Sequence, residues 1–313
     1  MSDYHIHLHP HRPTPGAPSM GTYPAGWIDR FVETALARGA TEVGFTEHLY
    51  RCVEAEPALG RWWETDPDSA LGAEMAAWIG SERNLSLTAY VETVLDAKAR
   101  GLPVRLGLEV DFVPGTEAAV GDLLAGIAFD YLIGSVHWIG GWNFMREGAP
   151  PEYGRRGVRR AFEQYFELEA ALAASGLVDV LAHVDVIKRH GHVPDGGLDE
   201  LYAPVVAAAA TSATAIEISS IGLRHTIGEL YPAPTFLSRF RDAGVPVTLG
   251  SDAHLPEDAA WGLDATIAAA RAAGYREYLR FEARRPIPTP LPARVAGPSE
   301  IAAREAPARS VPE

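Results

Sequence analysis

Short apolar runs alternate along this chain with longer amphipathic or alanine-rich segments. The strand-like runs are Asp3–Leu8, Thr41–Thr46, Val104–Val110, Tyr131–Val136, Val178–Ala182, Ala215–Ile218 and Val245–Leu249. The helical segments between them include Trp27–Arg38, Leu87–Arg100, Val158–Ala174, Leu198–Thr211 and Pro234–Ala243. Such alternation is typical of parallel βα units. The pattern therefore predicts an α/β fold in which helices surround a barrel of parallel strands.

The alternation also indicates how the chain is divided. Several predicted helices end at a glycine that precedes the next strand: Gly39, Gly101, Gly176 and Gly244. Residues 51–86, which carry three tryptophans, fit the pattern poorly and are predicted to be an insertion after the second strand. Beyond about residue 285 the chain is rich in Pro, Ala and Arg. We expect one barrel domain over residues 1–285 and a poorly ordered tail over 286–313.

Histidines and carboxylates gather where the predicted strands end. In chain order these residues are His5, His7, His9, His11, Glu47, His48, Glu109, Asp111, His137, His183, Asp185, Glu217, Asp252 and His254. The carboxyl ends of parallel barrel strands converge on one face, which is where active sites form. We therefore expect most of these side chains to share one site. Asp3, Asp111 and Asp185 are either orienting partners of the histidines or ordinary polar residues at strand ends.

The spacing of His5 and His7 suits a metal site, because residues two apart on a strand point to the same side. Imidazole together with carboxylate suits zinc, manganese or iron, and a carboxylate such as Glu109 can bridge two ions. Two ions about 3.5–4 Å apart generate a hydroxide nucleophile and clamp a transferring phosphoryl group. A lone HxH pair is a weak signal, but the full set is a strong one, because burying so many unpaired polar groups is costly.

Composition and charge restrict the partners. The chain has 313 residues, of which 47% are hydrophobic, enough for a substantial core. Its net charge of −14 argues against nucleic acid as a partner. The single cysteine, Cys52, excludes an internal disulfide framework and a multi-cysteine zinc site. The sequence has no apolar run of the ~20 residues that cross a bilayer. Its first residues lack signal-peptide features, so we expect a cytoplasmic protein with no membrane partner.

These motifs together resemble the PHP (polymerase and histidinol phosphatase) superfamily, and within it the histidinol-phosphatase branch. The resemblance runs from Asp3 to about Leu263. It is carried by Asp3-Tyr-His5-Ile-His7, Gly44-Phe-Thr-Glu47-His48, Gly107-Leu-Glu109-Val-Asp111, Gly134-Ser-Val-His137, His183-Val-Asp185-Val-Ile-Lys188 and Gly250-Ser-Asp252-Ala-His254. The run from Glu217 to Arg224, followed by Gly228-Glu-Leu-Tyr231-Pro232, resembles the phosphatase branch in particular. The fold that this implies is a distorted (β/α)7 TIM-like barrel with a metal cluster at the carboxyl ends of its strands.

The resemblance implies two or three divalent metal ions, which are Zn, Fe or Mn. One would be held by His5, His7, Glu109 and Asp252, and a second by Glu109, His137 and His183. A third would lie between His48, His254 and a histidine of the amino-terminal cluster. Here the chain departs from the family, because the stretch after the HxH pair is two residues shorter. We favour His11 for this ligand and keep His9 as the alternative.

The function that the resemblance implies is hydrolysis of a small phosphomonoester, with L-histidinol phosphate as the best single substrate. A metal-bridging hydroxide would attack phosphorus, and Asp252 or His254 would give the leaving alkoxide its proton. Arg224 is predicted to contact the phosphate, because a guanidinium fork matches phosphate geometry. Lys188 is a second candidate, for which a solvated surface cation is an equally good interpretation. Glu217 is either part of the site or a polar residue packed inside the barrel.

Other functions compete with this one. A related phosphoesterase would act on another small phosphate or a nucleotide. A polymerase-associated nuclease module would need a basic track, against which the net charge speaks. A metal-dependent amidohydrolase also opens with HxH, but often has a carboxylated lysine where this chain has His137. A non-enzymatic metal-binding module is disfavoured because only the choice between His9 and His11 is open. The oligomeric state, and whether the tryptophan-rich insertion is a lid or a subunit contact, cannot be determined from the sequence.

Overall fold

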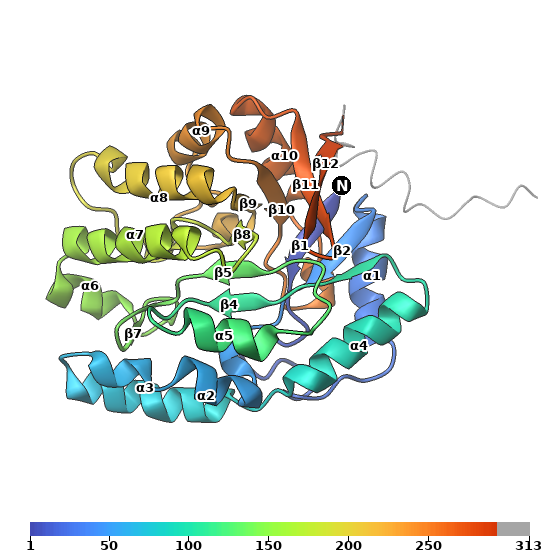
Figure 1. Ribbon diagram of the computed structural model, residues 1–313, viewed down its shortest axis with the longest axis horizontal. Helices are drawn as coiled ribbons and strands as arrows, with labels where there is room; N and C mark the ends of the chain where they lie inside the picture. Colours follow the sequence, from blue (N-terminus) through green and yellow to red (C-terminus); the bar gives the residue numbers. More distant parts are fainter. Residues whose placement is uncertain (293–313) are drawn as a thin grey trace, which may run out of the picture.

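A computed structural model describes residues 1–292, in which parallel strands lie inside a ring of helices (Figure 1). The parallel strands are β1 (Ser2–Ile6), β2 (Glu42–Phe45), β3 (Val104–Leu106), β4 (Glu109–Asp111), β5 (Ile133–Ser135), β8 (Val180–Leu181), β9 (Ala215–Ser219) and β10 (Val247–Gly250). They form a three-stranded sheet in the order β1-β2-β3 and a five-stranded sheet in the order β10-β9-β8-β5-β4. All pairs within these two sheets are parallel. The predicted α/β class is confirmed.

Short bridges join the two sheets at both edges. At one seam Ile6 pairs with Ala253, and the His7 amide donates to the Ala253 carbonyl at 2.7 Å. At the other seam His48 pairs with Glu109. Because β3 and β4 are two pieces of one predicted strand, the strands follow the seven-unit order expected, and the isolated bridges between the two sheets lie at the histidine-rich face. The result is a distorted, incompletely closed barrel whose sheets meet at the candidate site.

The barrel interior is filled by aromatic side chains below the histidine-rich face. Tyr4 and Tyr131 stack with ring centroids 4.8 Å apart, and the Tyr131 hydroxyl donates to the Tyr4 carbonyl at 2.9 Å. A Cβ atom at Gly44 would lie 2.0 Å from the Tyr131 hydroxyl oxygen, and one at Gly107 would lie 2.6 Å from the same ring. The two glycines are therefore required by the close approach of Tyr131 to the strands.

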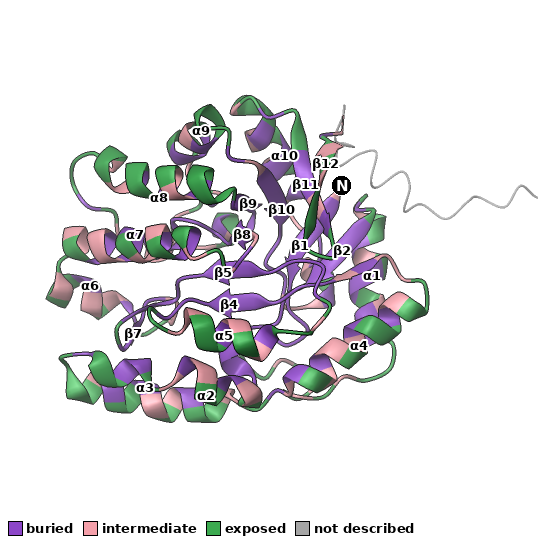
Figure 2. Ribbon diagram, viewed as in Figure 1, coloured by how far each residue is buried: buried purple, intermediate pink, exposed green. Residues whose placement is uncertain are grey.

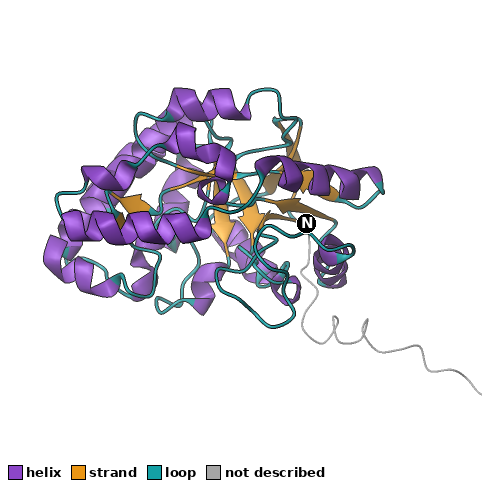
Figure 3. Ribbon diagram, turned by 90° about the horizontal axis from the view of Figure 1, so that it is seen from below, coloured by secondary structure: helices purple, strands orange, loops and turns teal. Residues whose placement is uncertain are grey.

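The surrounding helices match the amphipathic segments of the sequence. They are α1 (Trp27–Ala37), α4 (Leu87–Ala99), α5 (Glu117–Leu124), α7 (Val158–Ala174), α8 (Asp199–Ser212), α9 (Pro234–Asp242) and α10 (Leu263–Ala272). Each buries one side against the strands and exposes the other, as Figure 2 shows for the outer helices. The view turned by 90° places the strands in the middle of this layer (Figure 3). Within residues 1–292 no helix combines the length and apolarity that spanning a membrane requires.

The predicted insertion forms a short helical layer beside the barrel mouth. Its elements are η1 (Leu49–Arg51), η2 (Val53–Ala55), α2 (Glu56–Leu59), η3 (Trp62–Thr65) and α3 (Ser69–Glu82). It packs on the loop after β5, which carries β6 (Trp138–Ile139), β7 (Trp142–Asn143) and α6 (Pro150–Arg156). Asp66 links the two by accepting hydrogen bonds from the Gly141 amide at 2.9 Å and the Arg156 guanidinium at 2.8 Å. The insertion is thus held in place at the edge of the site.

The expectation of a poorly ordered tail from residue 286 is wrong for its first residues. The strands β11 (Glu277–Glu282) and β12 (Arg285–Pro290) form an antiparallel hairpin. Prolines alternate along β12, which suits an edge strand whose remaining amides face β11. Phe281 packs on Tyr131, with ring centroids 6.0 Å apart, so the hairpin caps the barrel end opposite the histidines. The rest of the predicted tail, residues 293–313, lies outside the described residues.

Candidate active site

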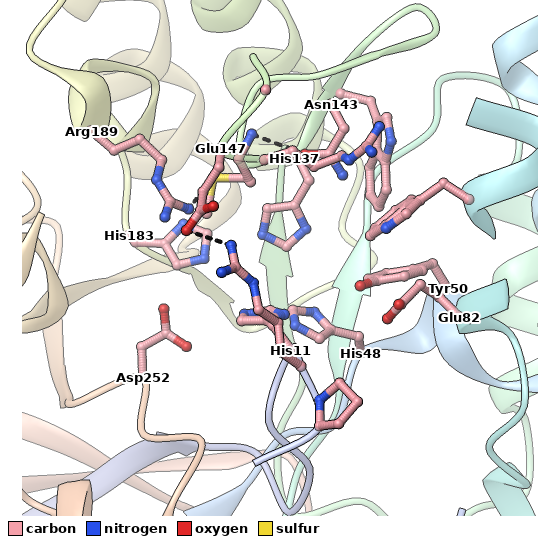
Figure 4. A pocket seen from close by; sticks show the side chains of 17 residues that line it. His11, His48, Tyr50, Glu82, His137, Asn143, Glu147, His183, Arg189 and Asp252 are labelled. Atoms are coloured by element: carbon pink, nitrogen blue, oxygen red, sulfur yellow. Dashed lines mark hydrogen bonds and ion pairs between the residues drawn. The ribbon is translucent and has the colours of Figure 1, made fainter. Parts of the chain in front are cut away.

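A cavity of about 560 Å³ opens at the carboxyl ends of the strands. The close-up in Figure 4 shows histidines at its centre, Arg189 and Glu147 on one side, and Tyr50 and Glu82 on the other. The lining residues are His11, Arg12, Pro13, His48, Tyr50, Trp78, Glu82, His137, Trp138, Asn143, Met145, Arg146, Glu147, Gly148, His183, Arg189 and Asp252. The predicted convergence of strand-end side chains on one site is therefore observed.

His5 and His7 face each other just behind the residues that line this cavity. Their Nε2 atoms are 3.1 Å apart, and Oδ1 of Asp252 lies 3.5 Å from the first and 3.4 Å from the second. Both imidazoles are buried and point the same ring nitrogen at the same spot. Because two lone pairs directed at each other repel, this arrangement fits a cation held between these three side chains. The donor set and its geometry thus fit a metal ion.

Glu109 lies at the centre of the histidines. Its Oε1 is 3.1 Å from His183 Nε2 and 3.5 Å from His137 Nε2, while its Oε2 is 2.6 Å from His48 Nδ1. Burial acts to raise the pKa of this carboxyl, but the neighbouring histidines outweigh it and hold the pKa well below its usual range. Glu109 therefore stays charged in a dry environment and has an oxygen on each side for a different ion, as a bridging ligand requires.

Two further carboxylates fix the orientation of histidine rings. Glu217 lies 3.0 Å from His5 Nδ1 and Asp111 lies 2.8 Å from His137 Nδ1, whereas Glu47, at 3.9 Å from His7 Nδ1, is beyond hydrogen-bond distance. A carboxylate at Nδ1 favours the tautomer that leaves Nε2 free to bind a metal. Asp111 is thus one of the predicted orienting residues. The role of Glu217 was left open by the sequence, and its contact with His5 places it inside the site.

A separate group consists of His7, His48 and His254. The His11 ring packs on His254 with centroids 4.0 Å apart and planes inclined by 36°, and its Nδ1 lies 2.9 Å from the fully buried guanidinium of Arg51. His254 Nε2 is buried and has no hydrogen-bond partner within residues 1–292. Burial and the neighbouring His7 lower the pKa of His254 to about 3. Burial also holds the pKa of His11 and of His48 well below the usual range, so His11, His48 and His254 are neutral, which is the form that binds metals.

His9 faces away from this group. Its Nδ1 lies 2.9 Å from Glu47 Oε1 and its Nε2 lies 3.1 Å from the Thr22 carbonyl oxygen. Both ring nitrogens are therefore engaged, whereas His11 lines the cavity. This geometry favours His11 over His9 as a ligand. The structure brings His5, His7, His11, His48, Glu109, His137, His183, Asp252 and His254 together around one cavity floor.

Two of the candidate ligands have unusual backbone conformations. The φ angles of His183 and Asp252 are 26° and 53°, in a region that residues other than glycine rarely adopt. Asp3 holds the loop before Asp252, since its carboxylate accepts from the Ser251 amide at 2.9 Å and the Ala260 amide at 2.7 Å. Strain of this kind persists only where the surroundings enforce it, and it clusters at functional sites. Asp3 thus acts through the loop, not through an imidazole.

The predicted phosphate-binding cations do not line the cavity. Lys188 is buried and pairs with Asp185 and Glu229, each at 3.0 Å. Arg224 pairs with Asp258 at 2.6 Å and lies over the Trp261 ring. The carboxylate partners already neutralise both cations, and the phosphate contact expected of each stays a prediction.

Arg189 lines the cavity instead. Its contact through Nη1 is with Met145 Sδ at 3.6 Å, and within residues 1–292 it forms no ion pair. It belongs to the 3₁₀ helix η4 (Val186–His190), where successive side chains point about 120° apart. Lys188 therefore turns into the protein while Arg189 turns towards His183. The signal that could have found it was its position directly after Lys188, in the loop after a strand that ends in His183.

Known proteins resemble this chain in sequence and in structure. The family model of the PHP domain matches residues 24–221. A curated protein of Deinococcus radiodurans named "Probable histidinol-phosphatase" is 33% identical over 227 residues, which cover 72% of this chain and 79% of that protein. The crystal structure of histidinol phosphate phosphatase from Lactococcus lactis, complexed with Zn, L-histidinol and phosphate, matches with a TM-score of 0.68 and 20% identity, covering 91% of this chain and 98% of the other. A structure from Listeria monocytogenes matches with a TM-score of 0.61 and 18% identity, covering 84% and 98%.

Proposed function

Because this chain belongs to the PHP domain family, we propose that it is a metal-dependent phosphomonoesterase that hydrolyses L-histidinol phosphate to L-histidinol and phosphate. The observation that carries the proposal is the charged, buried Glu109 with histidine nitrogens on both of its oxygens. A carboxylate so placed can join two metal ions into one centre for phosphoryl transfer. The name of the Deinococcus relative, at 33% identity, supports the choice of substrate.

Two ions form the core of the proposed centre, and a third site lies beside it. The first ion would be held by His5, His7, Glu109 and Asp252, and the second by Glu109, His137 and His183. The third would be held by His48, His254 and His11. The ligands suit Zn, Fe or Mn, and the zinc in the Lactococcus structure supports the first of these. Bound divalent ions supply a water nucleophile of lowered pKa and neutralise charge on a transferring phosphoryl group.

The residues of the chain then position the substrate around this centre. Arg189 faces the cavity without a carboxylate partner within the described residues, so its guanidinium is available to bind two phosphate oxygens. Asp252 is among the residues that line the cavity and His254 is not, while Nδ1 of His254 lies 3.0 Å from the backbone carbonyl oxygen of Asp252. Asp252 is therefore the better placed of the two candidates for passing a proton to the leaving alkoxide.

The test is release of phosphate from L-histidinol phosphate by metal-reconstituted protein, beside p-nitrophenyl phosphate and a panel of nucleotides. We expect a kcat/KM above about 10⁴ M⁻¹s⁻¹ on L-histidinol phosphate, and loss of that activity in His137→Ala. Equal activity on every ester would retain the phosphoesterase and overturn the substrate. If protein with bound metal releases phosphate from none of these esters, the proposed reaction is overturned.

A further inference from the structure

We propose that the insertion supplies the specificity subsite of the cavity, in which Trp78 and Glu82 of α3 bind the imidazole end of the substrate. The inference rests on the proposed function and adds the residues that distinguish L-histidinol phosphate from other phosphate esters. Both side chains line the same cavity as the metal ligands His48 and His137. They are four residues apart on one helix, so they project from the same face of α3.

An aromatic wall connects the metal ligands to Trp78. Tyr50 lies 5.1 Å from the His48 ring and stacks on Trp78 with ring centroids 5.6 Å apart and planes inclined by 29°. Trp138 follows His137 directly and meets Tyr50 edge-on at 5.1 Å. Trp62 supports Trp138 from the insertion side at 5.2 Å. The wall offers a flat, rigid surface beside the phosphate-binding centre, and flat nitrogen heterocycles bind such surfaces by stacking.

Glu82 places a carboxylate, paired with the buried Arg51, at the end of this wall. It is the last residue of α3, where the helix dipole disfavours an acidic side chain. Its carboxylate makes no hydrogen bond within residues 1–292, and its buried Oε2 lies 3.3 Å from Arg51 Nη2. An acid that lacks hydrogen-bond donors and faces a cavity is placed to accept a hydrogen bond from a ligand. The N–H of an imidazole, especially a protonated one, is such a donor.

Individual groups on the two sides of the cavity suit the two ends of this substrate. The sides do not differ in overall charge, because Glu147 lies on the Arg189 side and Arg146 lies over the Trp78 ring at 5.3 Å. Arg189 lies beside His183 on one side, and Tyr50 and Glu82 lie on the other, with His11 and His48 between them (Figure 4). L-Histidinol phosphate carries its anionic phosphate at one end and its imidazole at the other. With the phosphate at the metal ligands and Arg189, the imidazole extends towards Trp78 and Glu82. A nucleotide or a simple aryl phosphate offers no cationic group there.

The experiment compares kcat/KM on L-histidinol phosphate with kcat/KM on p-nitrophenyl phosphate for wild type, Glu82→Gln, Trp78→Leu and Trp78→Phe. We expect Glu82→Gln and Trp78→Leu to lower the ratio of the two values at least about tenfold, mainly through KM for L-histidinol phosphate, because the first removes the charged hydrogen-bond acceptor and the second removes the aromatic face. Trp78→Phe keeps a stacking face and should restore most of the ratio. Glu64→Gln, in the same insertion but outside the cavity, is the matched control and should leave both values unchanged.

The outcomes separate this inference from the proposed function. A wild-type enzyme that prefers L-histidinol phosphate and keeps its preference in Glu82→Gln and Trp78→Leu overturns the subsite alone. A wild type without that preference overturns the substrate, and the subsite with it. An equal loss of kcat/KM on both substrates, with an unchanged thermal midpoint, also overturns the subsite. It would mean that Trp78 and Glu82 affect the metal site and not the recognition of the imidazole. A melting curve of each variant identifies one that fails to fold, and Trp78→Phe then decides the matter.

Discussion

Glu109 and Glu169 are two glutamates with no exposed surface, and their surroundings differ completely. Glu109 lies at the barrel mouth among histidine nitrogens, of which the nearest is 2.6 Å away. Glu169 lies on α7 behind the strands, where the Tyr165 hydroxyl donates to it at 2.6 Å and its Oε2 has no partner within residues 1–292. Burial acts to raise the pKa of both. The histidines hold the pKa of Glu109 well below its usual range, whereas burial raises the pKa of Glu169 to about 8.

The difference shows which buried acids belong to the chemistry. A carboxylate keeps its charge in a dry environment only where cations or several donors surround it. Glu109 meets that condition and is a candidate metal ligand, while Glu169 is a neutral acid that helps to pack α7 against the barrel. Burial alone would have placed both in one class. The predictions below test this division between the barrel mouth and the layer behind it.

Removing the charge of Glu109 at the barrel mouth should have the largest effect on activity. Glu109→Gln keeps the shape of the side chain but removes the negative charge that joins the two proposed ions. We expect kcat/KM on L-histidinol phosphate to fall by about 10³-fold or more, because both ions contribute to charge stabilisation in phosphoryl transfer. Metal content, measured by elemental analysis after gel filtration, should fall as well. Glu169→Gln is the control, and equal losses in the two variants would abolish the distinction between them.

Arg189 and Lys188 are neighbours in the sequence, but Arg189 lines the cavity whereas Lys188 is buried in an ion pair. Arg189→Met removes an unpaired guanidinium from the cavity and should lower kcat/KM by about 10²–10³-fold, the usual loss for one donor to a transition-state oxyanion. Lys188→Met breaks a buried ion pair with Asp185 and should cost about 3 kcal/mol of unfolding free energy while changing kcat/KM less. Steady-state kinetics and urea unfolding measure the two effects. If Lys188→Met lowers kcat/KM more than Arg189→Met does, Lys188 is the residue that contacts the phosphate.

The sequence predicted the parts that depend on strand periodicity and missed those that depend on side-chain direction. The strand-end rule placed Glu109, His137 and His183 together, because parallel strands deliver their ends to one face. It could not separate Lys188 from Arg189, since the 3₁₀ geometry of η4 decides which of them turns inward. The strand β12 was missed for a related reason. Its composition resembles that of a disordered tail, and only pairing with β11 shows that prolines alternate along an edge.

The choice between His9 and His11 also depends on side-chain direction and can be tested by substitution. His11→Ala removes a ring from the mouth and should reduce metal content at the third site and lower kcat/KM by about 10–100-fold. His9→Ala breaks contacts with Glu47 and the Thr22 carbonyl, so we expect a loss of about 1–3 kcal/mol in unfolding free energy with unchanged metal content. If His9→Ala loses metal and His11→Ala does not, His9 is the ligand and His11 is not.

The smallest expected effect on activity lies behind the strands, where Glu169 changes the pH dependence of stability and not the reaction. Its native pKa of about 8 stands above the ordinary value of 4.5, because burial disfavours the charged form. Between these two values the native state holds a proton that the unfolded state has released, so its contribution to stability falls as pH rises, by up to about 1.4 kcal/mol per pH unit. Below the ordinary value both states are protonated and this dependence disappears.

Glu169→Gln removes the titrating group and keeps the size of the side chain. The unfolding free energy of wild type minus that of this variant should therefore decrease as the pH is raised from 5 to 8. Urea unfolding monitored by tryptophan fluorescence measures both values. The exposed Glu167 on the same helix supplies the control, since Glu167→Gln should leave that difference constant. A difference that grows with pH would mean that Glu169 is charged in the native state. A cation would then have to lie beside it, and it would belong with Glu109 after all.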